Sequence, residues 1–107
     1  MTILWLDFET RSTLELPEVG VDRYASHPTT DVWCMAWAFA DDEPIIVTPS
    51  EFTAKNGTRY LEHVRTGGLV YAHNAVFELA IWNEIMVPRY GWPPLLPSQC
   101  RCTMAMA

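Results

Sequence analysis

Two acidic residues, Asp7 and Glu9, close a short apolar run near the start of the chain. Residues 2–8 predict a strand, because they are bulky and a helix cannot be nucleated in so few residues before Pro17. Side chains two apart on a strand share one face, so the two carboxylates are expected close together. Such a pair is tolerated in water or around a divalent cation. The spacing leaves two interpretations open: solvated acids at a strand end, or metal ligands.

A second group of polar residues lies in the segment from His73 to Glu78. Asn74 is a residue type that caps helices, and residues 75–87 predict a helix that ends before Pro88. The helix is apolar on most sides, which is typical of a buried helix, and a buried Glu78 needs a partner or a metal ion. Alternatively, Glu78 sits in the first turn because it suits the helix dipole.

The elements around these acids decide whether the acids can meet. The sequence predicts strands at residues 2–8, 32–40, 45–48 and 69–72, helices at 58–66 and 75–87, a long loop at 10–31, an irregular connection at 88–99, and the start of another helix at 103–107. The order β-β-β-α-β-α is typical of an α/β fold. The first strand is apolar on both faces apart from Asp7, which predicts a central strand covered on both sides.

The predicted topology allows the acids of the two segments to lie close together. If the strands at 2–8 and 69–72 are neighbours, Asp7, Glu9 and Glu78 converge at one edge of the sheet, where strands end and helices begin. Three oxygen ligands suit hard cations such as Mg²⁺ or Mn²⁺. Paired cations of this kind activate water and stabilise the leaving oxygen in phosphodiester cleavage.

Composition and charge limit the classes of function. Half of the 107 residues are apolar and 19% are charged, which is typical of a folded globular chain. The net charge is −6, and residues 1–50 hold nine acids against two bases, which argues against a broad basic face that grips nucleic acid. No apolar stretch is long enough to span a membrane, and acids interrupt the N-terminal apolar run. We therefore expect no membrane association and a cytoplasmic location.

The two acidic segments resemble the motifs of the DEDD-type 3′–5′ exonucleases, which have a ribonuclease-H-like fold. Leu6-Asp7-Phe8-Glu9-Thr10 is similar to the first exonuclease motif, and Ala72-His73-Asn74-Ala75-Val76-Phe77-Glu78 is similar to the second. The likeness runs over essentially the whole chain. Within that family, the chain most resembles the N-terminal proofreading domain of phage-type family A DNA polymerases.

This resemblance implies a fold, a cofactor and the catalytic residues. The fold would be a ribonuclease-H-like mixed sheet. Asp7, Glu9 and Glu78 would be the catalytic carboxylates and would hold two divalent cations, Mg²⁺ or Mn²⁺. Glu78 stands where the family usually has an aspartate, so it carries one methylene more.

The resemblance also implies a substrate, the 3′ end of single-stranded DNA. Thr10 and Asn74 would lie near the 3′-terminal nucleotide, and Phe77 would pack behind the site, although an ordinary core position is the more common role for such a residue. The reaction would be hydrolysis of the 3′-terminal phosphodiester, as in proofreading.

The family's third motif, with its water-orienting tyrosine or histidine and its fourth acid, falls outside these residues. Residues 1–107 are therefore interpreted as the N-terminal part of a single exonuclease domain, incomplete at its C-terminus. We expect this part to be weak or inactive alone, and to be joined by a C-terminal portion or a polymerase domain. Two alternatives remain: an exonuclease of the same fold that acts on RNA or oligoribonucleotides, and a non-catalytic fragment or binding module that docks a partner chain.

The aromatic and basic residues add weaker indications. Four tryptophans fall in predicted strands or in the buried helix and are expected in the core: Trp5, Trp33, Trp37 and Trp82. Trp92 lies among prolines and is the candidate for an exposed base-stacking residue. Arg11 and Arg23 follow the first motif and could touch phosphates, although solvated loop arginines are more common.

Overall fold

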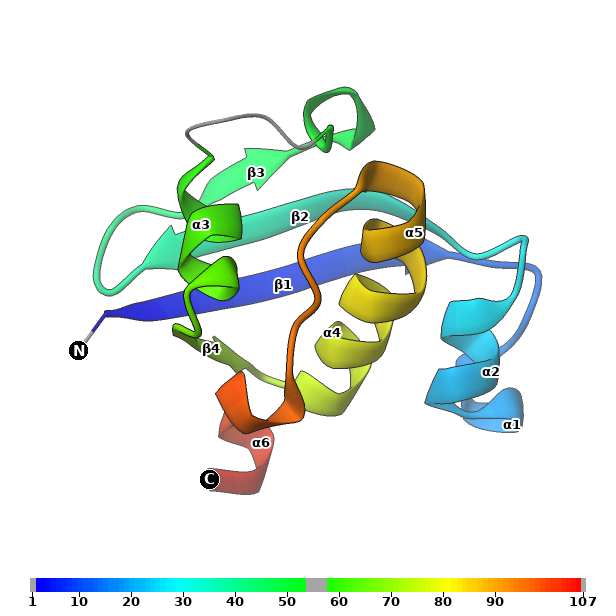
Figure 1. Ribbon diagram of the computed structural model, residues 1–107. Helices are drawn as coiled ribbons and strands as arrows, with labels where there is room; N and C mark the ends of the chain where they lie inside the picture. Colours follow the sequence, from blue (N-terminus) through cyan, green and yellow to red (C-terminus); the bar gives the residue numbers. More distant parts are fainter. Residues whose placement is uncertain (1, 54–57, 107) are drawn as a thin grey trace.

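A five-stranded mixed sheet forms the centre of the computed structural model, which describes residues 2–53 and 58–106 (Figure 1). The strands lie in the order β3-β2-β1-β4-β5. β1 pairs antiparallel with β2 and parallel with β4; β2 and β3 are antiparallel, and β4 and β5 are parallel. The strands are β1 (Ile3–Arg11), β2 (Asp31–Phe39), β3 (Ile45–Val47), β4 (Leu69–Ala72) and β5 (Cys100–Cys102). The α/β class, and β1 and β4 as neighbours, are confirmed.

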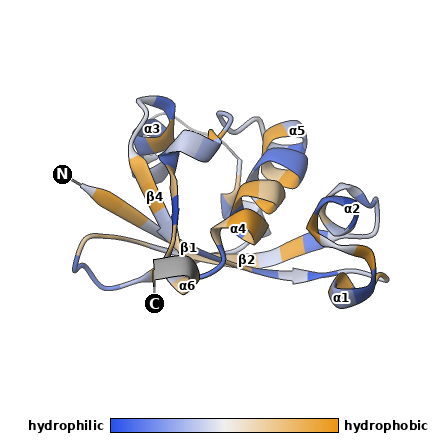
Figure 2. Ribbon diagram, turned by 90° about the horizontal axis from the view of Figure 1, so that it is seen from below, coloured by the Kyte–Doolittle hydropathy of each residue, from blue (hydrophilic) through white to orange (hydrophobic). Residues whose placement is uncertain are grey.

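The longer helices cover one side of this sheet. Figure 2 shows α3, α4 and α5 on the same side of β1 and β2, while α1 and α2 lie beyond one end of the strands. The helices are α1 (Leu16–Val19), α2 (Val21–Ser26), α3 (Arg59–Arg65), α4 (Ala75–Ile81), α5 (Val87–Tyr90) and α6 (Thr103–Met106), with 3₁₀ turns η1 (Pro49–Glu51) and η3 (Pro97–Gln99) and a π-helical turn η2 (Trp82–Met86). No helix in the described ranges is long and apolar enough to cross a membrane.

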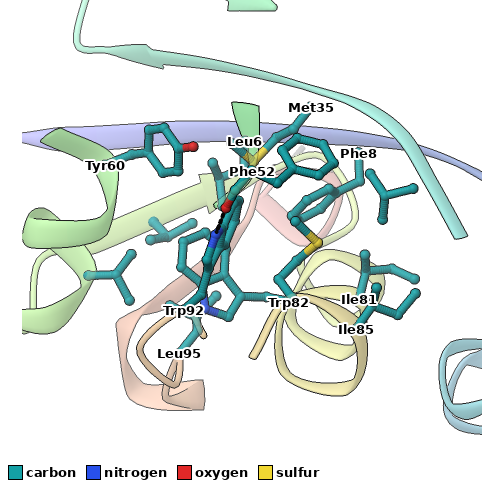
Figure 3. Packing of buried hydrophobic residues seen from close by; sticks show 14 of the residues in the cluster. Leu6, Phe8, Met35, Phe52, Tyr60, Ile81, Trp82, Ile85, Trp92 and Leu95 are labelled. Atoms are coloured by element: carbon teal, nitrogen blue, oxygen red, sulfur yellow. Dashed lines mark hydrogen bonds between the residues drawn. The ribbon is translucent and has the colours of Figure 1, made fainter. Parts of the chain in front are cut away.

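The core lies between the sheet and these helices (Figure 3). Along β1, Leu4, Leu6 and Phe8 are buried, and the residues between them are exposed, which is the period-two pattern of a strand with one covered face. The prediction that this strand is covered on both sides is wrong. The apolar pattern requires burial of one face only, and the covering helices lie on one side.

We call the uncovered side the open face. Directly paired residues share a face of a sheet, so the register identifies its members. They are Trp5, Asp7, Glu9 and Arg11 on β1, Asp31, Cys34, Ala36 and Ala38 on β2, Ile46 on β3, Tyr71 on β4, and Arg101 on β5.

The predicted loop at 10–31 is wrong in two respects. β1 continues to Arg11, where it pairs with Asp31 at the start of β2. The residues between the strands form the short helices α1 and α2, and Leu16 and Val19 pack against the core. Helices of four and six residues are too short to give a recognisable apolar period, so the sequence showed only the polar residues and prolines.

The predicted helix at 75–87 does not end before Pro88. It continues through η2 into α5, and Pro88 occupies the first turn of α5, where its missing N–H is least costly. The predicted irregular connection at 88–99 begins only after Tyr90 and includes η3, and β5 follows it although no strand was predicted there. The Cys-Arg-Cys sequence of β5 is too short to predict a strand. It forms a strand because it pairs with the edge of β4.

The burial of the tryptophans differs in part from the prediction. Trp82 is fully buried and Trp37 packs against the core, as expected. Trp5 and Trp33 are 39% and 58% exposed, because the side of the sheet they face is uncovered. Trp92 is buried, not exposed: the connection after α5 crosses the core, where the Trp92 indole packs on Trp82 and its N–H donates to the Phe52 carbonyl (Figure 3).

Candidate active site

The candidate site lies where β1 extends beyond its neighbour β4. Helix α3 ends in a turn through Gly67, whose positive φ of 88° suits glycine, and β4 starts directly after this turn. Trp5 pairs with Tyr71, and β4 ends one residue later at Ala72. β1 continues to Arg11, so its edge beyond Trp5 is no longer covered by β4.

Glu78 occupies this uncovered edge. It lies in α4, which begins just after β4, and its side chain is only 6% exposed. Its Oε2 accepts a hydrogen bond from the backbone N–H of Phe8 at 3.0 Å. Both interpretations of Glu78 hold: it lies in the first turn of α4, and it is buried with a partner, a backbone group between Asp7 and Glu9. The two sequence motifs therefore meet through this hydrogen bond.

The pKa of Glu78 is raised to about 8, mainly by burial; the hydrogen bond from Phe8 opposes the shift, and the carboxylates of Asp7 and Glu9 add to it. The carboxyl group is thus proton-bearing near neutral pH when no cation is present. Because Glu78 binds the backbone between Asp7 and Glu9, the three acids share one end of β1.

The three acids nevertheless approach from different sides of the strand. Asp7 and Glu9 are exposed on the open face, whereas Glu78 reaches the strand's edge from the helix side. In the part of the chain that the structure describes, no three histidine, cysteine, aspartate or glutamate side chains form a group that could hold a metal ion. The three acids therefore lie at the same edge of the sheet, as the topology predicts, but in the described residues they do not form a three-ligand cluster.

The donor chemistry at this edge fits a divalent cation. Carboxylate oxygens are the ligands that Mg²⁺ and Mn²⁺ prefer, and a buried acid beside two others is a site whose charge a cation would balance. Asp7 and Glu9 could hold a cation from the open face. Glu78 could join them only after exchanging its proton and adjusting its contact with Phe8.

The predicted substrate-binding residues lie around this edge in different environments. The Thr10 hydroxyl is hydrogen-bonded to the Tyr24 hydroxyl at 2.8 Å, on the helix side of β1 and away from the open face. Asn74 is half-buried just before α4, and its side chain makes no capping hydrogen bond. Phe77 is half-buried, its ring 6.2 Å from that of Tyr24, and it packs against the core. Phe77 therefore has the core contacts expected of an ordinary packing residue.

A cavity beside Asp7 was not anticipated from the sequence. Its volume is about 500 Å³. Most of its lining is apolar and includes Trp5, Ala36 and Ala38 of the open face, and Asp7, His73 and Thr103 are its polar lining residues. Trp5, whose ring packs edge-on against Tyr71 at 5.2 Å, forms part of the wall. The only sequence signal was the position of Trp5 two residues before Asp7, on the same face.

A scan of the chain against protein-family models finds no match, and searches of curated proteins and of solved structures find none.

Proposed function

We propose that this chain is the N-terminal part of a metal-dependent 3′–5′ exonuclease domain of the ribonuclease-H-like type. It would hydrolyse the 3′-terminal phosphodiester of single-stranded DNA. One observation carries the proposal: the Glu78 carboxylate, from the second motif, binds the backbone of the first motif between Asp7 and Glu9. Two motifs some 70 residues apart thus share one strand end.

In this proposal, the position of each acid determines its role. Asp7 and Glu9 are exposed on the open face and would hold the cations where a nucleic acid strand can reach them. Glu78, whose pKa is raised to about 8, would have to lose its proton to join them as a ligand. When bound, two Mg²⁺ or Mn²⁺ ions would supply an activated water and would stabilise the leaving oxygen.

The remaining parts of the machinery lie outside residues 1–107. The third motif of the resembled family supplies the water-orienting residue and a fourth acid. We propose that a C-terminal portion, followed or not by a polymerase domain, packs on the open face and fills the cavity beside Trp5 and Asp7. The site of action is the cytoplasm, or the host cell cytoplasm for a phage protein.

The activity is tested by the shortening of 5′-labelled single-stranded DNA in Mn²⁺. We expect little or no cleavage by the 107-residue chain and 3′–5′ cleavage once a C-terminal portion is supplied. Asp7→Asn should abolish that cleavage, and Asp22→Asn, which changes an exposed acid of α2, should not. Strong cleavage by the chain alone would overturn the prediction of inactivity, and no cleavage by the completed domain would overturn the exonuclease proposal. A matched RNA strand as competitor decides between the DNA and RNA alternatives.

A non-catalytic binding module is the second candidate, because the Glu78–Phe8 hydrogen bond alone gives Glu78 a structural role. Calorimetry with Mn²⁺ separates the two functions. Binding that is lost in both Asp7→Ala and Glu78→Ala supports a metal site. Absence of binding by the folded wild-type chain supports the module.

A further inference from the structure

Trp33 and Arg11 form an exposed pair next to the candidate active site. The Arg11 guanidinium lies over the Trp33 ring, 5.8 Å from its centroid, within the range of a cation–π contact. Trp33 is 58% exposed, more than Trp5, which is 39% exposed. A large aromatic surface beside a cation is thus open to solvent.

The strand register places this pair on the same face as the acids. Asp7, Glu9 and Arg11 alternate along β1, so they share the open face. Glu9 pairs with Cys34, and Thr10 pairs with Val32, which leaves Trp33 out of the pairing at an irregularity of β2. Because the Trp33 ring contacts Arg11, it lies on the open side of the sheet, beside a residue two positions along β1 from Glu9.

Arg11 is free to interact with a ligand. Its partner across the strands is Asp31, and that carboxylate pairs with Arg89 at 3.4 Å. Within residues 2–53 and 58–106, no ion pair involves Arg11. Arg23, the other arginine near the first motif, lies in α2, which contacts β1 on the helix side through the hydrogen bond between Tyr24 and Thr10. Arg101, on β5, donates to the backbone carbonyls of Ser98 and Cys100. Arg11 is thus the arginine that shares a strand with Asp7 and Glu9 and contacts the Trp33 ring.

We propose that Trp33 and Arg11 form a platform for one nucleotide of a single-stranded nucleic acid, with the base stacked on the indole and a phosphate at the guanidinium. The inference rests on the proposed function and names the part of the site that orients the strand toward Asp7 and Glu9. Stacking is tolerant of sequence because every base has an aromatic face. The platform also explains how an acidic chain without a broad basic face binds a polyanion: a stacked base and one arginine hold the strand.

Trp5, the other exposed tryptophan of the open face, does not fit this role. Its ring packs against Tyr71 and forms a wall of the cavity, and no arginine–ring contact involves it in the described part of the chain. A protein segment on the Trp33 surface is the competing occupant, and it would not require the unpaired guanidinium.

The test is metal-free binding of a short fluorescein-labelled oligo(dT) to the 107-residue chain, measured by anisotropy in EDTA. Trp33→Ala should weaken binding roughly tenfold, the effect of removing one stacked base, and Trp33→Phe should retain most of the affinity. Arg11→Ala should reduce the slope of log K against log salt by about 0.7, the value for one phosphate contact on a single strand, whereas Trp33→Ala should leave the slope unchanged. Leu96→Ala, which removes an exposed apolar side chain outside the open face, is the matched control.

The outcomes separate the platform from the proposed activity. Wild-type affinity in Trp33→Ala, or no oligo(dT) binding by the folded wild-type chain, overturns the platform. Self-association that depends on Trp33, with no effect on oligo(dT), also overturns it. If the completed domain does not cleave DNA but Trp33→Ala still weakens binding, the exonuclease proposal fails and the platform stands. Circular dichroism and thermal unfolding establish that each variant is folded.

Discussion

The Glu78 carboxylate accepts its hydrogen bond from the Phe8 N–H at a place where β4 no longer covers β1. A side chain from a helix thus takes the position that a neighbouring strand would otherwise fill. The same contact holds α4 against β1 and keeps a buried acid between two exposed ones.

Replacing Glu78 by Gln should remove a pH dependence of stability. Because the pKa of Glu78 in the folded chain is about 8, well above its ordinary value, the folded state binds an extra proton between about pH 4.5 and pH 8. The free energy of unfolding of the wild type should therefore fall as the pH rises through this window. Gln cannot ionise and keeps an acceptor for Phe8, so Glu78→Gln should be more stable than the wild type at pH 9, by roughly 2–4 kcal/mol.

Urea unfolding in EDTA from pH 4 to pH 9 measures this difference. Glu84→Gln, an exposed change in η2, is the control and should keep the wild-type pH dependence. Parallel pH profiles of wild type and Glu78→Gln would contradict the raised pKa.

Mn²⁺ binding should strengthen as the pH rises toward 8. Ligation by Glu78 requires loss of the proton that its raised pKa retains, so the apparent affinity should increase up to about tenfold per pH unit below pH 8. Calorimetry in buffers of different ionisation enthalpy should detect about one proton released per Glu78 at pH 7. If Mn²⁺ binds with the same affinity at pH 6 and pH 8, Glu78 is not a ligand.

Trp92 should be one of the most destabilising positions to truncate. Its ring lies 4.6 Å from that of Trp82 and 5.3 Å from that of Tyr60, and its N–H donates to Phe52. Trp92→Ala should lower the free energy of unfolding by about 3–5 kcal/mol, the usual range for a buried tryptophan. Leu96→Ala, at an exposed position of the same connection, should change it by less than about 0.5 kcal/mol. Urea midpoints that are equal for the two variants would show that Trp92 is not a core residue.

The Cys100 thiol should react slowly with alkylating reagents near neutral pH. Burial raises its pKa to about 11, against the opposing effect of Arg101, so only about one molecule in a thousand carries the thiolate at pH 8. Alkylation by iodoacetamide, followed by mass spectrometry of the Cys100 peptide, should accelerate with pH until about pH 11. A rate that levels off near pH 9 would indicate an ordinary, accessible thiol.

The sequence predicts some parts of this molecule well, for physical reasons. The strand at 69–72 is correct at both ends because Gly67 and Gly68 precede it and a helix cap follows it. The burial of Glu78 follows from the apolar helix around it, and its position beside the first motif follows from the pairing of β1 with β4.

Other features depend on long-range packing that no local pattern carries. The apolar residues of β1 cannot reveal whether its second face is covered, so the exposure of Trp5 and Trp33 was not predictable. The prolines around Trp92 indicate an irregular backbone, which is correct, but not that this backbone crosses the core. The stacking candidate therefore moves from Trp92 to Trp33.

The central position of β1 also governs the order in which the molecule can fold. β1 can pair with β2 soon after both strands are synthesised. The other edge of β1 stays unpaired until β4 has been synthesised, because Ile3 pairs with Leu69. Contacts so distant along the chain form slowly, because a long loop must close first. Until then, the β1–β2–β3 meander exposes a bare strand edge that other chains can pair with. Variants that delay β4 or α4 should therefore aggregate during synthesis, even when the finished fold tolerates them.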